Sequence, residues 1–413
     1  MSGGPAIDAG RVVAELRELH TLTGTGAGAQ RVCWTETWRE AQSLIAERLG
    51  ELGLEPERDE AGNVWAYLEG DAEPALAVGS HVDSVPDGGW LDGALGVMAA
   101  LGVVRAWAQS GERPPRTLAF VDWADEEGAR FGRSLFGSSA FSGTLAPDEA
   151  RELRDSEGVS IVDALAENGV ELDRALEAGS RRSRLGAYLE LHIEQGPVLE
   201  ADGLHSAAVD GCVGIERRRF VFRGQASHAG TTPMDRRRDA GLAAADAALR
   251  IEAIGRDHDG MATTGTLALR PGIATAVAGE AELLVDLRHP DAGELAAMLD
   301  EATGGAAAAA SGRDCEFDSE HVWSIEPIAF DPELVEQARA AGRDTTGSDR
   351  VLTSGALHDA AEAARVVPVA MMFCPSIAAI RSGSGVSSSF AWLMPAIEAF
   401  GLLANRVLDS ELG

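Results

Sequence analysis

Residues 76–81 read Leu76-Ala77-Val78-Gly79-Ser80-His81, a short apolar run that ends in two polar residues. The same pattern returns in Thr117–Trp123 and in Ala187–Leu191, each of which is followed by polar residues. Short apolar runs of this kind are typical of buried strands. Between the first two runs, residues 93–109 are apolar with helical spacing. Strands therefore alternate with helices, and the sequence predicts an α/β fold with an open, mostly parallel sheet.

Both ends of the chain are expected to contribute to this first domain. Residues 11–53 have helical spacing that ends at Gly53, and Asp331-Pro332 is suited to opening a helix. The segment 367–373 then has the pattern of a further apolar strand. Because a single core stops growing at roughly 250–300 residues, we expect a second domain in this chain of 413 residues.

The pattern changes after Gly211, where strands and helices follow in the order β-α-β-β-α-β. This order is typical of a ferredoxin-like α+β domain. We therefore predict a catalytic domain in two parts, 1–212 and 327–413, with a ferredoxin-like domain inserted at 213–326. Gly304–Ser311 is rich in Gly and Ala and is expected to be a helix end with a loose loop. The predicted elements of the insert are strand Arg217–Gly224, helix Asp239–Glu252, strands Thr264–Leu269 and Glu282–Leu287, helix Ala292–Ala302 and strand Cys315–Trp323.

The charge of the chain narrows the classes of partner. A net charge of −31 would repel nucleic-acid phosphates and anionic lipid surfaces, so neither nucleic acid nor a membrane is an expected partner. A small polar substrate is favoured. The sequence contains no lysine, and all 35 basic residues are arginine. This excludes Schiff-base chemistry on lysine, a pyridoxal phosphate anchor and a P-loop lysine.

The cysteines and the N-terminus favour a reducing compartment. Cys33, Cys212, Cys315 and Cys374 form no C-x-x-C pair, which argues against a zinc knuckle or a redox motif and favours buried free thiols. Residues 1–12 lack the basic and apolar regions of a secretion signal, and no apolar run reaches about 18 residues. We expect a cytoplasmic protein.

The first cluster that carries chemistry follows the run at 76–81. His81 stands at a strand end, Asp83 follows two residues later, and Asp92 lies in a glycine-flanked loop. A histidine oriented by one carboxylate, with a second carboxylate nearby, suits a divalent metal. Glycines beside Asp92 allow the backbone to turn tightly. Taken alone, the same segment also fits an ordinary acidic surface loop.

The second cluster, Asp125-Glu126-Glu127-Gly128, follows the strand that ends at Trp123. Adjacent side chains on an extended chain point in opposite directions, so one glutamate can bind a metal while the other accepts a proton from a metal-bound water. Alone, an Asp-Glu-Glu run is more typical of a solvated turn.

The third cluster contains His192 and Gln195, again directly after a strand. A neutral imidazole from this strand end can complete a metal site, and the amide of Gln195 can bind a substrate carbonyl or amide group. An isolated histidine here would usually be structural. All three clusters stand at predicted strand ends, which is where an open α/β sheet binds its ligand.

Together these motifs resemble those of the di-zinc amidohydrolases that include N-carbamoyl-L-amino-acid amidohydrolase, allantoate amidohydrolase and β-ureidopropionase, the hydantoinase/carbamoylase-type amidases. The resemblance spans nearly the whole chain, and the combination of motifs is highly specific. The segments that carry it are Gly62-Asn63-Val64, His81-Val82-Asp83, Leu91-Asp92-Gly93, residues 125–132 and residues 189–197.

The resemblance implies a first metal held by His81, Asp92 and His192, with Asp92 bridging to a second metal held partly by Glu127. Glu126 would be the general base. The expected metal is zinc, or Mn, Co or Ni in its place. Such a site polarises a scissile carbonyl and lowers the pKa of a bound water towards neutrality.

The resemblance also assigns residues outside these clusters. In the family, the histidine matched by His228 binds substrate and stabilises the developing oxyanion, reaching the active site of the partner subunit. Arg288 matches an arginine that grips a substrate carboxylate, and His358 matches a further motif of the substrate site. The resemblance thus implies a homodimer formed through the inserted domain, which would serve as a lid and dimerisation domain, and a small substrate with a carboxylate. Without the resemblance, Arg288 would be a surface charge and His228 a loop residue.

Two positions depart from the family pattern. Where the family has the histidine that completes the second metal site, the best match here is Ser388. A neutral hydroxyl has neither the charge nor the imidazole lone pair of a good ligand, so we expect one complete metal position and a second ion that is weakly held or absent. Relatives also tend to carry a substrate-contacting asparagine at or near Thr275, so the substrate of the relatives cannot be assigned directly to this chain.

Three hypotheses follow. The leading one is metal-dependent hydrolysis of a linear amide C–N bond in an N-carbamoyl amino acid or related ureide. The second is a repurposed family member that uses one metal on a different C–N bond, or for a condensation or cyclisation. The third is a non-catalytic binding protein that has kept the fold but lost part of the second metal site.

Overall fold

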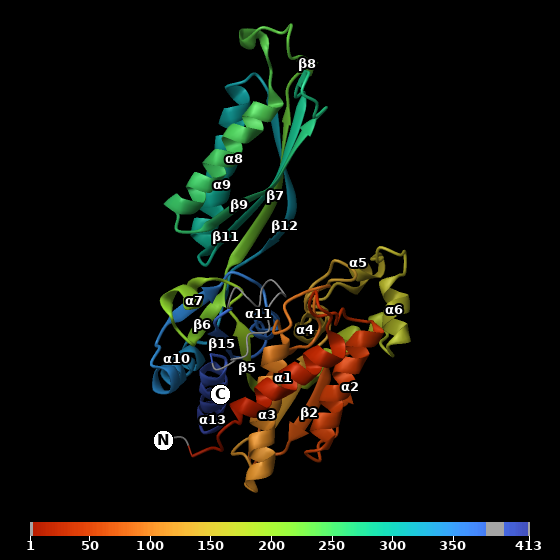
Figure 1. Cartoon of the computed structure of the whole chain (residues 1–413), viewed down its shortest axis with the longest axis vertical. Helices are drawn as coiled ribbons and strands as arrows, with labels where there is room; N and C mark the ends of the chain where they lie inside the picture. The colour runs from red at the N-terminus through yellow and green to blue at the C-terminus, as the bar shows by residue number, and fades with distance from the viewer. Residues whose placement is uncertain (1–2, 377–391, 412–413) are drawn as a thin grey trace. The chain divides into compact units, whose positions relative to one another are not determined.

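The computed structural model describes residues 3–376 and 392–411, which form two compact units (Figure 1). One unit contains the chain up to Asp210 together with the chain from Ala329 onward, and the other contains Gly211–Ile328. Each unit has its own sheet and its own hydrophobic core.

A nine-stranded sheet forms the centre of the first unit in the described residues. Its strands are β1 (Glu57–Arg58), β2 (Val64–Leu68), β3 (Ala75–His81), β4 (Leu118–Trp123), β5 (Leu185–Ile193), β6 (Ala207–Cys212), β13 (Ile328–Ala329), β14 (Val351–Ser354) and β15 (Val369–Cys374). They lie in the order β1-β2-β4-β3-β5-β15-β6-β13, and β14 pairs with β6. The four central strands, β4, β3, β5 and β15, run parallel, and the strands that flank them are antiparallel.

Burial explains the sequence of the central strands. All seven residues of β3 and all six residues of β4 are buried, which matches the near-continuous apolar runs expected of a parallel sheet covered on both faces. Helix α3 (Ala94–Ser110) packs on β3, β4 and β5 and is itself apolar and largely buried. The predicted open, mostly parallel α/β sheet is confirmed.

The remaining helices of the first unit cover this core. The expected helical entry at 11–53 consists of two helices, because Asp8 and Thr35 each cap a separate helix with a side-chain oxygen. Helices α1 and α13 pack against α3, and α10 packs against α13. The helices are α1 (Ala9–Thr23), α2 (Glu36–Gly50), α4 (Phe136–Ser142), α5 (Pro147–Arg151), α6 (Ile161–Glu167), η1 (Leu172–Arg184), α7 (Val198–Asp202), α10 (Pro332–Thr346), α11 (Asp359–Ala363) and α13 (Met394–Leu408).

The second unit has the predicted β-α-β-β-α-β order. Its main elements are β7 (Gly214–Arg223), α8 (Ala240–Asp257), β9 (Met261–Arg270), β11 (Glu280–His289), α9 (Ala292–Ser311) and β12 (Glu316–Ile325). The four strands are antiparallel in the order β12-β7-β11-β9, the ferredoxin-like arrangement. Helices α8 and α9 pack on this sheet around a core that includes Phe220, Leu283 and Met298.

The expected loose loop at Gly304–Ser311 is wrong, because α9 continues to Ser311. The Ala-rich segment favours a helix, and its Ala306, Ala309 and Ala310 side chains are buried in the core of the second unit. Burial of this alanine face compensates for the low helix propensity of the two glycines before it.

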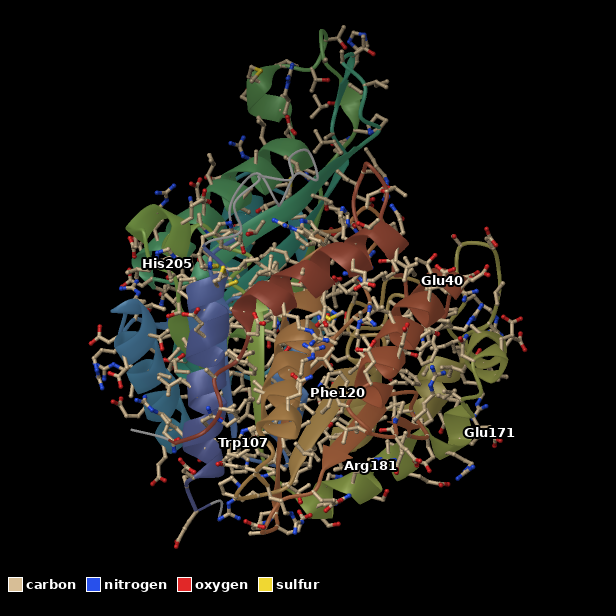
Figure 2. All side chains as sticks on the ribbon, turned by 60° about the horizontal axis from the view of Figure 1, so that its bottom comes forward. Glu40, Trp107, Phe120, Glu171, Arg181 and His205 are labelled. Carbon is tan, nitrogen blue, oxygen red and sulfur yellow. The ribbon has the colours of Figure 1, made fainter. Side chains whose placement is uncertain are left out.

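Side chains follow the expected partition between core and surface (Figure 2). Phe120 lies inside the first unit, whereas Glu40, Glu171 and His205 are exposed. Among the described helices, none is both long enough and apolar enough to cross a bilayer.

Candidate metal centre

The three clusters predicted from the sequence meet at one edge of the parallel sheet. His81 is the last residue of β3, Asp125 follows β4, and His192 is the last residue but one of β5. These neighbouring parallel strands end at the same edge, which is where ligands bind in open α/β sheets. The strand ends therefore bring together residues that are more than a hundred positions apart in the sequence.

His81, Asp92 and His192 each offer one ligand atom, and these three atoms lie within 4.8 Å of one another. Nε2 of His192 is 3.3 Å from Oδ1 of Asp92, and the two imidazole rings are 5.8 Å apart between centroids. Both histidines are buried. Two imidazoles and one carboxylate are ligands that zinc and other first-row divalent metals accept.

The hydrogen bonds of the two histidines leave the right nitrogens available. Nδ1 of His192 lies 2.9 Å from the carbonyl oxygen of Ile193, and Nδ1 of His81 lies 3.2 Å from that of Asp83. A carbonyl oxygen accepts a hydrogen bond, so Nδ1 is the protonated nitrogen in each ring and Nε2 carries the free lone pair. Nε2 of His192 is buried without a hydrogen-bond partner. The residues therefore fit a metal ion.

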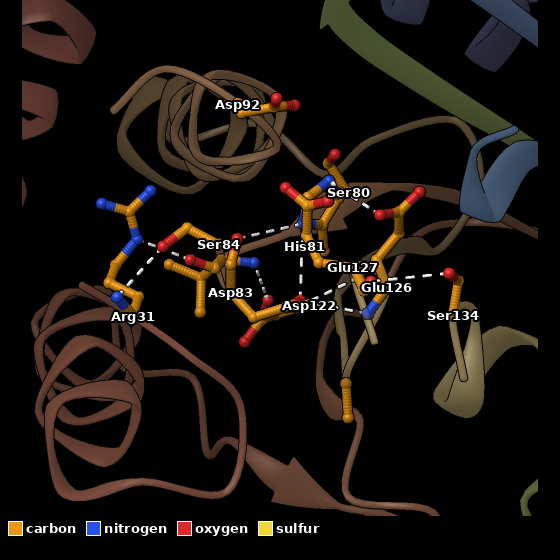
Figure 3. Close-up of polar contacts among 12 residues, drawn as sticks. Arg31, Ser80, His81, Asp83, Ser84, Asp92, Asp122, Glu126, Glu127 and Ser134 are labelled. Atoms are coloured by element: carbon orange, nitrogen blue, oxygen red, sulfur yellow. Dashed lines mark hydrogen bonds and ion pairs between the residues drawn. The ribbon is translucent and has the colours of Figure 1, made fainter. Parts of the chain in front are cut away.

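Asp83 links the first two clusters (Figure 3). One of its carboxylate oxygens is 3.4 Å from Nδ1 of His81 and accepts a hydrogen bond from the backbone N–H of Glu126 at 3.2 Å. The other accepts from the backbone N–H of Glu127, also at 3.2 Å. Asp83 thus orients His81 and fixes the backbone that carries both glutamates.

Gly93 allows Asp92 to approach the histidines. Its φ is 61°, in the left-handed region, and a Cβ there would lie 2.3 Å from the carbonyl oxygen of His81 and 2.4 Å from its ring. No other residue type fits this space without moving His81.

A buried arginine braces the loop between His81 and Asp92. Nε of Arg31 donates to the carbonyl oxygen of Val82 at 2.6 Å, and Nη2 donates to that of Trp90 at 3.4 Å. Burial lowers the pKa of Arg31 to about 10, although nearby carboxylates, including Asp83 and Asp92, favour its charged form. The guanidinium stays protonated at neutral pH and offsets part of the negative charge of the site.

Glu126 lies beside the histidines rather than within the three-atom ligand set. One of its carboxylate oxygens is 3.8 Å from Nε2 of His81. Burial raises the pKa of Glu126 well above its usual value, and the negative charges of Asp359 and Glu127 add to this, whereas His81 acts in the opposite direction. A carboxylate with a raised pKa next to a metal site is a suitable proton acceptor.

The second predicted metal position is less complete. In the part of the chain that the structure describes, Glu127 does not belong to the group of ligand atoms formed by His81, Asp92 and His192. Burial raises the pKa of Glu127 to about 7. Ser388, the residue expected in place of the usual histidine, lies outside the described residues.

His358 and Gln195 stand next to the cluster. The His358 ring is 4.4 Å from that of His192 between centroids, and its Nε2 lies 2.9 Å from Oγ of Ser354. Burial keeps the pKa of His358 well below its usual value, so this ring is neutral. The side-chain amide of Gln195 donates to Asp92 at 2.8 Å.

A cavity of about 210 Å³ opens beside Asp92. Asp92, Gln195 and Ser376 form its polar part, and its apolar lining comes from Leu91, Ile193 and Trp392. This lining offers both polar and apolar contacts to a small molecule bound beside Asp92.

In the second unit, the structure brings His228 and Thr275 together. Strand β8 (Ser227–His228) pairs with β10 (Ala276–Val277), and the backbone N–H of Ala229 donates to the carbonyl oxygen of Thr275 at 2.9 Å. His228 is exposed.

Arg288 lies elsewhere in the second unit, in β11, where its Nε donates to Asp286 at 2.6 Å. Arg217 also donates to Asp286, at 2.8 Å. Burial raises the pKa of Asp286, but hydrogen bonds from Arg288 and Arg217 outweigh it and leave the pKa below its usual value.

Three buried residues of the site were not assigned a role from the sequence. Asp122 in β4 accepts from the backbone N–H of Val82 at 2.8 Å, and Glu190 in β5 accepts from Oγ of Ser80 at 2.7 Å. A charged residue inside an otherwise apolar strand is a signal that could have found both. Arg31 gave no such signal, because it lies in a loop far from the residues it contacts.

Comparison with known proteins shows to which family the chain belongs. Residues 77–405 match the profile of Peptidase family M20/M25/M40, which is most of the chain. The chain belongs to this family. It is 34% identical over 373 residues to N-carbamoyl-L-amino-acid amidohydrolase of Paenarthrobacter aurescens, covering 89% of this chain and 90% of the relative. It is 33% identical over 384 residues to allantoate amidohydrolase of Escherichia coli (strain K12), covering 92% and 93%.

The solved structures agree with the family. A hydantoinase/carbamoylase family amidase from Burkholderia multivorans has a TM-score of 0.88 and 33% identity, covering 97% of this chain and 98% of that protein. The chain is an amidohydrolase of the M20 family, whose named relatives act on C–N bonds other than peptide bonds. The family resemblance and the enzyme class predicted from the sequence are confirmed.

Proposed function

We propose that the chain hydrolyses a linear amide C–N bond in an N-carbamoyl amino acid or a related ureide. The observation that carries this proposal is the convergence of His81, Asp92 and His192 within 4.8 Å of one another, with Glu126 beside them. The names of the relatives point to the same substrate class.

We assign His81, Asp92 and His192 as ligands of one divalent ion, zinc or Mn, Co or Ni in its place, and Glu127 as partial ligand of a weaker second position. When bound, the ion supplies Lewis-acid polarisation of the carbonyl and lowers the pKa of the attacking water. Asp83 keeps the lone pair of His81 Nε2 directed to the ligand position, through its contacts with Nδ1.

Glu126 acts as the proton carrier. Its carboxylate accepts a proton as the water oxygen bonds to the carbonyl carbon, and returns that proton to the leaving nitrogen as the C–N bond breaks. Burial and neighbouring carboxylates raise the pKa of Glu126 and so make it a stronger base than an exposed glutamate.

The remaining residues bind the substrate in this proposal. Gln195 and His358 lie beside the ligand cluster and contact the ureide, whereas Arg288 binds the substrate carboxylate and His228 donates to the developing oxyanion. Support comes from the family resemblance and, for Gln195 and His358, from their contacts with Asp92 and His192.

The decisive experiment is a substrate panel. Metal-free protein is loaded in turn with Zn, Mn, Co or Ni and assayed on N-carbamoyl amino acids and on allantoate. We expect metal-dependent turnover of at least one member. A protein that binds metal and turns over no member would contradict the proposal.

A second function is favoured by Thr275, which lies beside His228 at a position where the family resemblance implies an asparagine. The chain would then use one metal to cleave, or to form, a different C–N bond. Inactivity on all ureides, together with metal-dependent activity on another amide, would support this alternative.

We further propose a homodimer formed through the inserted unit and a cytoplasmic location. Strand β9 lies at the edge of its sheet and exposes Met261, Leu267 and Leu269, which a second copy would cover. Light scattering of the purified chain tests the homodimer, and a monomer at micromolar concentration would contradict it.

A further inference from the structure

The loop that carries His228 is held by backbone contacts on one side. His228 lies opposite Ala276 in the β8–β10 pair, and the next residue, Ala229, donates its N–H to Thr275. Nδ1 of His228 accepts a hydrogen bond from the backbone N–H of Gly230 at 3.1 Å. Since Nδ1 is the acceptor, a neutral His228 carries its proton on Nε2. The ring is thereby set as a hydrogen-bond donor at Nε2.

The side chain of Arg237 also holds this loop. Its Nη2 donates to the carbonyl oxygen of Ala229 at 2.6 Å, and its Nε donates to that of Thr232 at 3.1 Å. One planar guanidinium therefore spans both ends of the turn that follows His228. Arg237 is partly buried and precedes α8, whose first turn is capped by Asp239. The arginine thus connects the loop to a fixed helix.

We propose that Arg237 is a positioning residue for His228. It fixes the Ala229–Thr232 turn, and with it the N–H of Gly230 that selects the Nε2-protonated ring. This inference rests on the proposed role of His228 as a hydrogen-bond donor to the substrate. Lysine cannot replace the arginine, because a single ammonium group lacks the planar fork that bonds two carbonyls at once.

The neighbouring arginine provides a matched control. The side chain of Arg236 is 79% exposed, and it lies 3.7 Å from Asp235 in a weak surface ion pair. Arg236→Lys and Arg236→Met change the same residue type one position away without affecting the loop carbonyls.

The first test is kinetic and uses the full chain with metal bound. For Arg237→Lys and Arg237→Met we expect kcat to fall about 10- to 100-fold, as for other groups that misplace a catalytic residue, with KM, metal content and melting temperature little changed. The Arg236 variants should match the wild type. In the double variant His228→Gln/Arg237→Met, kcat should be no lower than in His228→Gln, because both changes remove the same contribution of the His228 ring.

Two kinetic results would overturn the inference. One is an Arg237→Met variant that is as fast as the wild type. The other is a double variant in which the two losses multiply, because independent effects would mean that Arg237 does not act through His228.

The second test reads the ring directly and needs no activity. In protein labelled with ¹⁵N-histidine, the signals absent from His228→Gln identify the His228 ring. At a pH where the ring is neutral, we expect a protonated Nε2 and an unprotonated Nδ1 in the wild type and in Arg236→Met, and a mixture of tautomers in Arg237→Met. An unchanged tautomer in Arg237→Met would refute the inference even if every substrate in the panel proved inactive.

Discussion

The candidate site depends on close contacts that single residues permit. Gly93 is the sharpest case, because its backbone lies in the left-handed region and directly against His81. Nearby Gly89 lies in the same loop, but its nearest neighbour for a Cβ is Cβ of Asp92 at 3.9 Å, an ordinary contact. Substitutions at these two glycines therefore distinguish an effect on loop flexibility from an effect on the geometry of the metal site.

Gly93→Ala is expected to displace His81, since the new Cβ would lie within 2.4 Å of its ring. We expect loss of bound metal and of activity, together with a destabilisation of at least ~1 kcal/mol from the backbone strain. Metal analysis and thermal unfolding measure both. Gly89→Ala is the control and should retain metal, and similar metal loss in both variants would contradict the assigned geometry.

Glu126→Gln removes the proposed base but keeps the shape of the side chain. Turnover should fall by about 10²–10⁴-fold, the usual contribution of general-base catalysis. The bound metal should remain, because Glu126 is not part of the His81–Asp92–His192 ligand set. A variant that kept metal and full activity would exclude Glu126 as the base.

At the scale of elements, the strands could be predicted more completely than the loops. The apolar runs that became β3, β4 and β5 were recognisable because both faces of these strands are buried, and their polar ends therefore marked the site. Contacts made by distant loops left no such pattern. Arg31 is fully buried against Val82 and Trp90, yet nothing near it in the sequence indicates this.

In helix α9 the sequence prediction was wrong, because the Gly/Ala-rich composition of its last part was interpreted as a loop. Gly304 lies inside this helix, is exposed, and has no atom near the position of a Cβ. Gly304→Ala should therefore stabilise the inserted unit by about 1 kcal/mol. Calorimetric unfolding measures the shift, and a loss of stability would show that the helix ends earlier.

Gly347→Ala is the matched contrast. This glycine follows α10 with a φ of 76°, so alanine there should destabilise the first unit by about 1–2 kcal/mol. The same substitution would thus have opposite signs at two positions, which would exclude a general effect of replacing glycine.

At the scale of the whole molecule, the buried acids of the site should determine how stability depends on pH. Burial raises the pKa of Asp122 to about 7 and, with the charge of Asp83, that of Asp125 to about 8. Their unfolded values lie near 4. Between about pH 4 and these raised pKa values, the folded state holds protons that the unfolded state has released. The free energy of unfolding therefore falls as the pH rises through this range.

For metal-free protein we therefore expect a lower melting temperature at pH 8 than at pH 5.5. Each proton held contributes a slope of about 1.4 kcal/mol per pH unit. Bound metal should make the dependence shallower, because its positive charge favours the ionised acids. Asp122→Asn should also reduce the slope. A melting temperature that rises with pH in the metal-free chain would contradict the assignment of these buried acids.

The central claim is metal-dependent hydrolysis of a ureide by the His81–Asp92–His192 site. The most direct measurement is turnover of the N-carbamoyl amino acid and allantoate panel by protein whose bound metal has been counted in the same sample. We predict turnover with about one tightly bound divalent ion per chain, lost on chelation and restored by adding the ion back. Full metal loading without turnover of any ureide, or turnover that survives complete removal of metal, would contradict the claim.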